Sequence, residues 1–184
     1  TNSVAIGTSA TTSSNNQAVA IGQSSSASFQ SVAIGLNAAT TGNTAVAIGS
    51  SARTSAQNSI AIGTSSNAAQ DATAIGNSAR ATGYQSSAFG NGTSASGQNS
   101  TVIGNGATTS QANAIVIGTS GNRTGIGTNT PDERLHVAGS IKIVDGTQAN
   151  NYVLTSDANG KASWKDPSGT KVYGEIYRNS NLTL

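Results

Sequence analysis

A short apolar motif recurs along the first part of the chain. The first five copies have the order apolar, small, apolar, glycine, the last four drift from it, and polar residues separate each copy from the next. The motif glycines are Gly7, Gly22, Gly35, Gly49, Gly63, Gly76, Gly90, Gly104 and Gly118. Successive glycines lie 13 to 15 residues apart, a spacing typical of a tandem structural repeat.

The two apolar positions lie one and three residues before the glycine, so they share one face of a β-strand. No copy has the i, i+3, i+4 spacing of an amphipathic helix. We expect these alternating side chains to form the core. They are Val4, Ile6, Val19, Ile21, Val32, Ile34, Val46, Ile48, Ile60, Ile62, Ile75, Phe89, Ile103, Ile115 and Ile117. The residue between them, Ala in seven copies, is expected to point outward.

The rest of each repeat predicts the fold class. A second small residue follows each glycine at a distance of three, and a polar turn leads to the next motif. About 14 residues suffice for two short strands and two tight turns, which is one coil of a parallel β-solenoid. Glycine suits the bend because it permits positive φ and a close neighbouring backbone. We therefore expect an all-β protein with nine coils, followed by a small β-rich collar.

Each coil offers few large apolar side chains to offset the conformational entropy of ordering it. We therefore expect a homo-oligomer, in which the small outward Ala lets another subunit pack closely. A homotrimer wound about one axis is the predicted assembly. Val102 and Val116 replace the Ala in the last two copies, and we expect them to widen the trimer or fill its axis.

The run Asn2-Ser3-Val4-Ala5-Ile6-Gly7, repeated about every 14 residues, resembles the head repeat of YadA-type trimeric autotransporter adhesins. The resemblance covers residues 1–118. It implies trimers of left-handed parallel β-rolls that attach to surfaces. It bears more strongly on fold and oligomeric state than on biological role, because function does not follow from fold.

Charge divides the chain into two parts. The chain has nine basic and seven acidic residues, but residues 1–118 contain only Arg53, Arg80 and Asp71. With no basic stripe, we expect no nucleic-acid partner. With no apolar run of membrane-spanning length, we expect no membrane insertion. The change in charge predicts a boundary between the solenoid over 1–118 and a collar over 119–168. A strand pattern after Pro167-Ser168-Gly169 predicts the start of a further β domain over 169–184.

The collar contains further strand patterns. We expect strands at 135–139, 141–144, 152–155 and 161–164, with a hairpin turn over 157–160. Segments within 123–164 resemble connectors of bacteriophage tail fibres. The residues that carry the resemblance are Gly125-Ile126-Gly127-Thr128, Pro131, Leu135-His136-Val137, Gly139, Ile141, Val153-Leu154-Thr155-Ser156-Asp157 and Gly160-Lys161-Ala162-Ser163-Trp164.

The sequence offers no set of residues for catalysis, and we expect no enzyme activity, cofactor or metal. Asp132 and Glu133 near His136 are the only local concentration of titratable groups. A turn followed by a half-exposed strand accounts for them, and a lone His is a poor metal signature.

Four residues are candidate receptor contacts, all assigned to variable turns: Phe29, Arg53, Arg80 and Tyr84. The two aromatic residues could stack on a glycan, or they could fill hydrophobic gaps between subunits.

The leading functional hypothesis is a trimeric tail fibre or receptor-binding fibre of a bacterial virus. Its partners would be a host receptor or glycan and other virion proteins, and its location the virion. The motive is a repeat shaft with tail-fibre-like connectors and without a coiled-coil stalk or membrane anchor in this sequence. The alternative is a trimeric adhesin on a bacterial cell surface.

Overall fold

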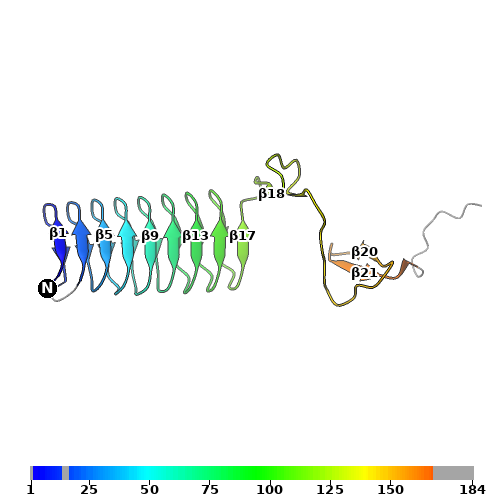
Figure 1. Ribbon diagram of the computed structural model, residues 1–184, viewed down its shortest axis with the longest axis horizontal. Coiled ribbons are helices and arrows are strands. Elements are labelled where there is room, and N and C mark those ends of the chain that lie inside the picture. Colours follow the sequence, from blue (N-terminus) through cyan, green and yellow to red (C-terminus); the bar gives the residue numbers. More distant parts are fainter. Residues whose placement is uncertain (1, 14–16, 168–184) are drawn as a thin grey trace, which may run out of the picture. The chain divides into compact units, whose positions relative to one another are not determined.

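The computed structural model describes residues 2–13 and 17–167, and its elements are β-strands (Figure 1). The chain divides into two compact units, one ending at His136 and the other beginning at Val137. The predicted domain at 169–184 lies outside the described residues.

The solenoid consists of two parallel sheets. We call the nine-stranded sheet sheet A and the eight-stranded sheet sheet B. The strands of sheet A are β1 (Val4–Ile6), β3 (Val19–Ile21), β5 (Val32–Ile34), β7 (Val46–Ile48), β9 (Ile60–Ile62), β11 (Thr73–Ile75), β13 (Ser87–Phe89), β15 (Thr101–Ile103) and β17 (Ile115–Ile117). The strands of sheet B are β2 (Thr11–Thr12), β4 (Ser26–Ala27), β6 (Ala39–Thr40), β8 (Arg53–Thr54), β10 (Asn67–Ala68), β12 (Arg80–Ala81), β14 (Ser94–Ala95) and β16 (Thr108–Thr109).

Successive coils stack in register. Val4 pairs with Val19, Ala5 with Ala20 and Ile6 with Ile21, and equivalent pairs continue through the sheet. Nine strands at a spacing of about 4.8 Å give a solenoid roughly 38 Å long. The prediction of two short strands and two turns per repeat is confirmed, except that the described ninth coil has no strand in sheet B.

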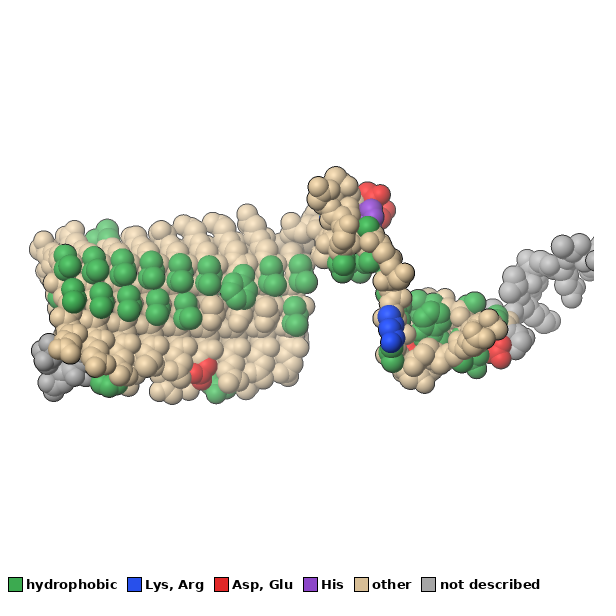
Figure 2. Space-filling model, in the orientation of Figure 1, with side chains coloured by type: hydrophobic (Ala, Val, Ile, Leu, Met, Phe, Trp, Pro, Cys, Tyr) green, Lys and Arg blue, Asp and Glu red, His purple; other side chains and the backbone are tan. Residues whose placement is uncertain are grey.

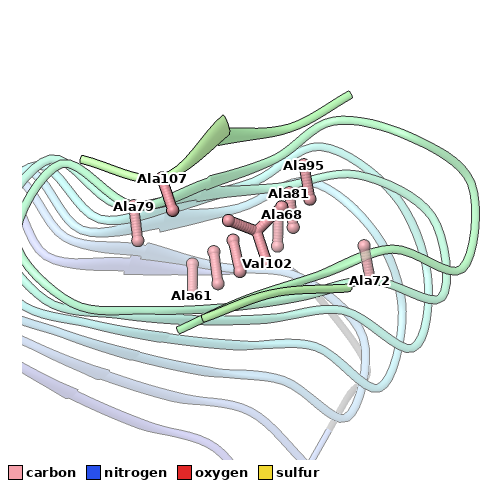
Figure 3. Packing of buried hydrophobic residues seen from close by; sticks show 10 residues of the cluster. Ala61, Ala68, Ala72, Ala79, Ala81, Ala95, Val102 and Ala107 are labelled. Atoms are coloured by element: carbon pink, nitrogen blue, oxygen red, sulfur yellow. The ribbon is translucent and has the colours of Figure 1, made fainter. Parts of the chain in front are cut away.

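The interior of each coil is lined by small residues. Ala20, Ala33, Ala61 and Ala88, at the middle of sheet A strands, are fully buried. Figure 3 shows Ala61 and Val102 from sheet A facing Ala68, Ala81 and Ala95 from sheet B. The two sheets therefore enclose a layer only about one methyl group deep from each side.

The residues predicted as core lie on the outer face of the sheet A strands, and the Ala between them faces inward. The predicted inner and outer faces were therefore the wrong way round. Each is half-buried or exposed in the single chain: Val4, Ile6, Val19, Ile21, Val32, Ile34, Val46, Ile48, Ile60, Ile62, Ile75, Phe89, Ile103, Ile115 and Ile117. A coil of about 14 residues closes too tightly to hold branched side chains from every strand. Val102 and Val116 are exceptions on the inner face, where Val102 is fully buried and Val116 packs against the same cluster. The expectation that Val102 faces the trimer was therefore wrong.

The bend glycines have the positive φ and the close approach that we predicted. Their φ values are 127° to 137° from Gly7 to Gly90, 116° at Gly104 and 74° at Gly118. A Cβ on Gly63 would lie 2.3 Å from the carbonyl oxygen of Gly76 in the next coil. A side chain at this bend would therefore separate adjacent coils.

Small side chains, some of which carry a hydroxyl, occupy both turns of the coil. The position two residues after the bend glycine is left-handed, as at Ser24 (φ 55°), and Ser, Asn and Gly occupy it in the first eight repeats. The next position is buried, and where it is Ser or Thr its hydroxyl donates to the bend carbonyl, as from Ser66 to Gly63 (2.8 Å). At the second turn, the buried Ser59, Ser86 and Ser100 make the same bond three residues back. The buried hydroxyls at these two turns are thus satisfied locally.

Two small sheets follow the solenoid. The strands β18 (Thr124–Ile126) and β19 (Leu135–Val137) form one, and β20 (Val153–Ser156) and β21 (Ala162–Lys165) form an antiparallel hairpin. The expected strands at 135–139 and 152–155 and the return strand are confirmed with shifted ends. The strand expected at 141–144 does not form, because no strand in the described chain pairs with it.

Replacing Gly63 by Ala tests the close approach of the bends. The alanine would have to adopt φ +129°, and its Cβ would collide with the Gly76 backbone. We expect a loss of at least about 2 kcal/mol in the free energy of unfolding, measured by denaturant titration at fixed chain concentration. Gly121→Ala is the control, because nothing lies within 4 Å of its Cβ. Equal stability of the two variants would contradict the glycine argument.

Two equivalent threonines inside sheet B offer a second test. The Oγ1 of Thr40 accepts a bond from the backbone N–H of Ser28 (2.9 Å), whereas the buried Oγ1 of Thr54 has no partner in the described chain. Thr40→Val should cost about 1–3 kcal/mol of stability, because it leaves the partly buried N–H of Ser28 without its acceptor. Thr54→Val should be neutral or stabilising, and comparison of the two thermal midpoints checks the difference.

Candidate functional site

The outer face of sheet A carries two rows of side chains along the solenoid. We call the row just before the bend glycines the Ile row; it consists of Ile6, Ile21, Ile34, Ile48, Ile62, Ile75, Phe89, Ile103 and Ile117. The second row, which we call the Val row, consists of Val4, Val19, Val32, Val46, Ile60, Thr73, Ser87, Thr101 and Ile115. The register of the strands aligns each row along the solenoid.

These rows form an extended apolar surface. Figure 2 shows the Ile row as a continuous line of hydrophobic side chains, while the Val row is interrupted near its far end. The interruption corresponds to Thr73, Ser87 and Thr101. In coils away from the two ends of the solenoid, the side chain of Ile75 remains 38% exposed and that of Ile103 43%. A continuous apolar strip of this kind marks an interaction surface.

The outer face of sheet B is polar. Each of the first eight coils contributes one outward residue, and the strand register aligns them as Thr11, Ser26, Ala39, Arg53, Asn67, Arg80, Ser94 and Thr108. The assignment of Arg53 and Arg80 to variable turns was therefore wrong. They lie in strands, where both are exposed, and Asn67 lies between them on the intervening coil.

The two candidate aromatic contacts occupy the turn that leads from sheet B to sheet A. The carbonyl oxygens of Phe29 and Tyr84 accept equivalent bonds, from the backbone N–H groups of Thr44 and Asn99. They therefore occupy the same position of the repeat, four coils or roughly 19 Å apart. Phe29 is 39% and Tyr84 42% exposed. They do not form a joint site with each other.

Beside these aromatic residues, side-chain bonds link the left-handed turn positions of successive coils. The Nδ2 of Asn58 donates to Oδ1 of Asp71 (3.0 Å), and the hydroxyl of Thr44 donates to Oδ1 of Asn58 (2.7 Å). Asn99 donates to Asn113 in the same way (3.1 Å). These bonds connect coils and hold the carboxylate of Asp71, so this turn edge presents few free polar groups.

The titratable cluster expected after the solenoid forms only in part. The Nδ1 of His136 and Oδ1 of Asp132 lie 2.6 Å apart, and the side chains are 32% and 79% exposed. Glu133 is exposed and makes no ion pair in the described chain. Among residues 2–13 and 17–167, no group of three or more His, Cys, Asp or Glu is placed to hold a metal ion.

A perturbed carboxylate lies in the second unit. The backbone N–H and the hydroxyl of Thr147 both donate to Oδ1 of Asp145, at 2.9 and 2.7 Å. These bonds hold the pKa of Asp145 below its ordinary value. The bonds lie within one exposed turn, so they stabilise that turn rather than define a reactive site.

Residue-by-residue reasoning missed the proximity of Arg53, Asn67 and Arg80. Aligning the repeats on their glycines would have found it, because each of the three lies four residues after its bend glycine. In the described chain, no helix is long and apolar enough to cross a membrane.

Comparison with known proteins supports the geometry. The family model of the YadA head domain repeat (2 copies) matches the sequence at residues 1–25, 29–52, 41–66, 55–71, 68–93 and 95–120. Among solved structures, the collagen-binding domain of the Yersinia adhesin YadA is similar, with 26% identity and a TM-score of 0.55. The alignment covers 63% of this chain and 69% of that domain. A search of curated proteins gave no match. The chain therefore belongs to the YadA head domain repeat family.

Proposed function

We propose that this chain is the attachment head of a homotrimeric adhesin on a bacterial surface. The family match over the solenoid carries the proposal, supported by the likeness to the collagen-binding domain of the Yersinia adhesin YadA. In this proposal the head has a structural and binding role, without enzyme activity, a cofactor or a nucleic-acid partner.

The apolar face of sheet A supports the trimer. A coil filled with Ala and Ser buries little large apolar surface of its own, while its Val and Ile side chains remain partly exposed. Three copies packed around an axis along the solenoid would cover these side chains on each other. The hydrophobic surface that a single coil leaves open is then buried between subunits. Thus the residues predicted as core are core residues of the assembly.

The trimer is tested by Ile75→Asp combined with Ile103→Asp. Both side chains lie in the Ile row and are partly exposed in one chain. The new carboxylates are therefore costly chiefly in the trimer, where they would be buried without a partner. We expect light scattering to give three times the chain mass of 18.1 kDa for the unchanged protein. The double variant should lose that trimer, whether the released chains stay folded or unfold.

The matched control places the same charges on the other sheet. Ser26→Asp combined with Thr108→Asp changes two exposed positions of sheet B, and it should leave the mass unchanged. A stable single chain at micromolar concentration, or a trimer that survives the Ile row substitutions, would overturn the proposed assembly.

The virion hypothesis finds less support. The family matches end at residue 120, and no comparison supports the tail-fibre resemblance of residues 123–164. The small sheets formed by β18–β19 and β20–β21 are compatible with many connectors. The findings favour the cell-surface alternative, and the viral fibre remains an untested prediction.

Attachment and location are tested together. Antibodies against residues 1–118 should label intact, uninfected cells of the source bacterium, and beads coated with the trimer should adhere to collagen-containing matrix. Adhesion should fall steeply for the Ile75→Asp, Ile103→Asp variant, because three linked heads bind more tightly than one. Labelling restricted to virus particles, with adhesion to bacterial cells alone, would instead establish the viral fibre.

A further inference from the structure

Positive charge in the solenoid is confined to one column. Among residues 1–118 only Arg53 and Arg80 are basic, and both occupy the outer column of sheet B. The strand register pairs Asn67 with Arg53 on one side and with Arg80 on the other. The two arginines are therefore two strand spacings apart, about 10 Å along the solenoid.

None of these three side chains has a partner in the described chain. The structure records no ion pair or side-chain hydrogen bond for Arg53, Asn67 or Arg80 in residues 2–13 and 17–167. Asp71, the one acidic residue of 1–118, lies at a left-handed turn position and accepts a hydrogen bond from Asn58. Two guanidinium groups and an amide are thus free to bind a ligand.

The surroundings leave this column open. Its neighbours along the sheet are the small residues Ala39 and Ser94, so the face is flat on both sides of the arginines. The column lies on the outer face of sheet B, whereas the apolar rows lie on sheet A. Figure 2 views the apolar face and shows no Lys or Arg over the solenoid. The arginines therefore stay accessible when sheet A is covered.

Guanidinium groups bind carboxylates and related oxyanions through paired N–H donors. A DNA strand presents a phosphate every 3.4 Å, far more densely than one arginine per about 10 Å. A polysaccharide with one acidic group per disaccharide spaces its charges more widely, and its hydroxyls suit the amide of Asn67. The spacing and the neutral surroundings therefore favour an acidic polysaccharide over a nucleic acid.

We propose that Arg53, Asn67 and Arg80 form a binding column for a linear acidic polysaccharide that runs along the outer face of sheet B. In the proposed trimer, each subunit would present one such column. This inference rests on the proposed role as an attachment head and names the class of ligand for one of its faces.

The test measures binding of the full 184-residue trimer to immobilised chondroitin sulfate and hyaluronan, with neutral dextran and single-stranded DNA as comparisons. Binding to chondroitin sulfate alone would show that sulfate is needed, and binding to both would show that carboxylate suffices. Arg53→Gln combined with Arg80→Gln should weaken the binding about tenfold or more, because two charged hydrogen-bonding groups are lost. Added salt should weaken polysaccharide binding by the unchanged protein more than binding by the variant.

A charge-matched variant separates a specific column from general attraction. Arg80→Gln combined with Thr108→Arg keeps the net charge and the column but places the arginines four coils apart. We expect it to bind as weakly as the single Arg80→Gln variant. Full binding by this variant, equal affinity for single-stranded DNA, or no binding to either polysaccharide in 50 mM salt would each overturn the proposal.

The same trimers are applied to collagen-containing matrix. If the arginine variants adhere normally and fail only on polysaccharide, the column is confirmed as a separate site. If the unchanged trimer adheres to matrix but ignores polysaccharide, the column is refuted and the attachment role stands. Failure of the unchanged trimer on matrix and bacterial cells would refute the attachment role itself, whatever the polysaccharide result.

Discussion

The space inside one coil is the constraint on which this structure depends. Two sheets face each other across a layer of Ala, Ser and Thr, and adjacent bends approach so closely that a Cβ at Gly22 would lie 2.5 Å from the Gly35 carbonyl oxygen. Such closeness allows every coil to hydrogen-bond to its neighbours with little deviation in register. It also excludes large side chains from nearly all inner positions, as dense packing requires.

The excluded side chains determine how the two outer faces differ. Val and Ile gather on sheet A, while sheet B carries mostly small polar residues and two arginines. One face therefore suits burial against other copies, and the other suits contact with water and a polar ligand. In the proposed trimer, assembly and attachment use opposite sides of the same coil. A substitution on one face can therefore change one of these interactions without altering the residues of the other.

The repeat period predicted the coil, its two strands and the position of its bend, because backbone hydrogen bonding and glycine geometry depend on local sequence. Period two alone shows that Val46 and Ile48 share a face, but it does not show whether that face is inside. Side-chain volume decides this, and the small size of Ala47 would have been the signal. Likewise, Arg53 and Arg80 were placed in turns because the strands of sheet B are only two residues long and carry no apolar alternation. The isolated segment 141–144 has the right pattern for a strand, but a strand also needs a partner.

Contact restricted to adjacent coils has an evolutionary consequence. Removing or duplicating one whole repeat leaves every remaining neighbour contact of the same kind, so tandem recombination in the gene can alter reach without redesigning the fold. Each such event would change the height of the head by about 4.8 Å. The differences of one residue between repeats fall in the turns, which absorb them while the strands keep their register. Selection can therefore adjust how far the head projects independently of what any single coil displays.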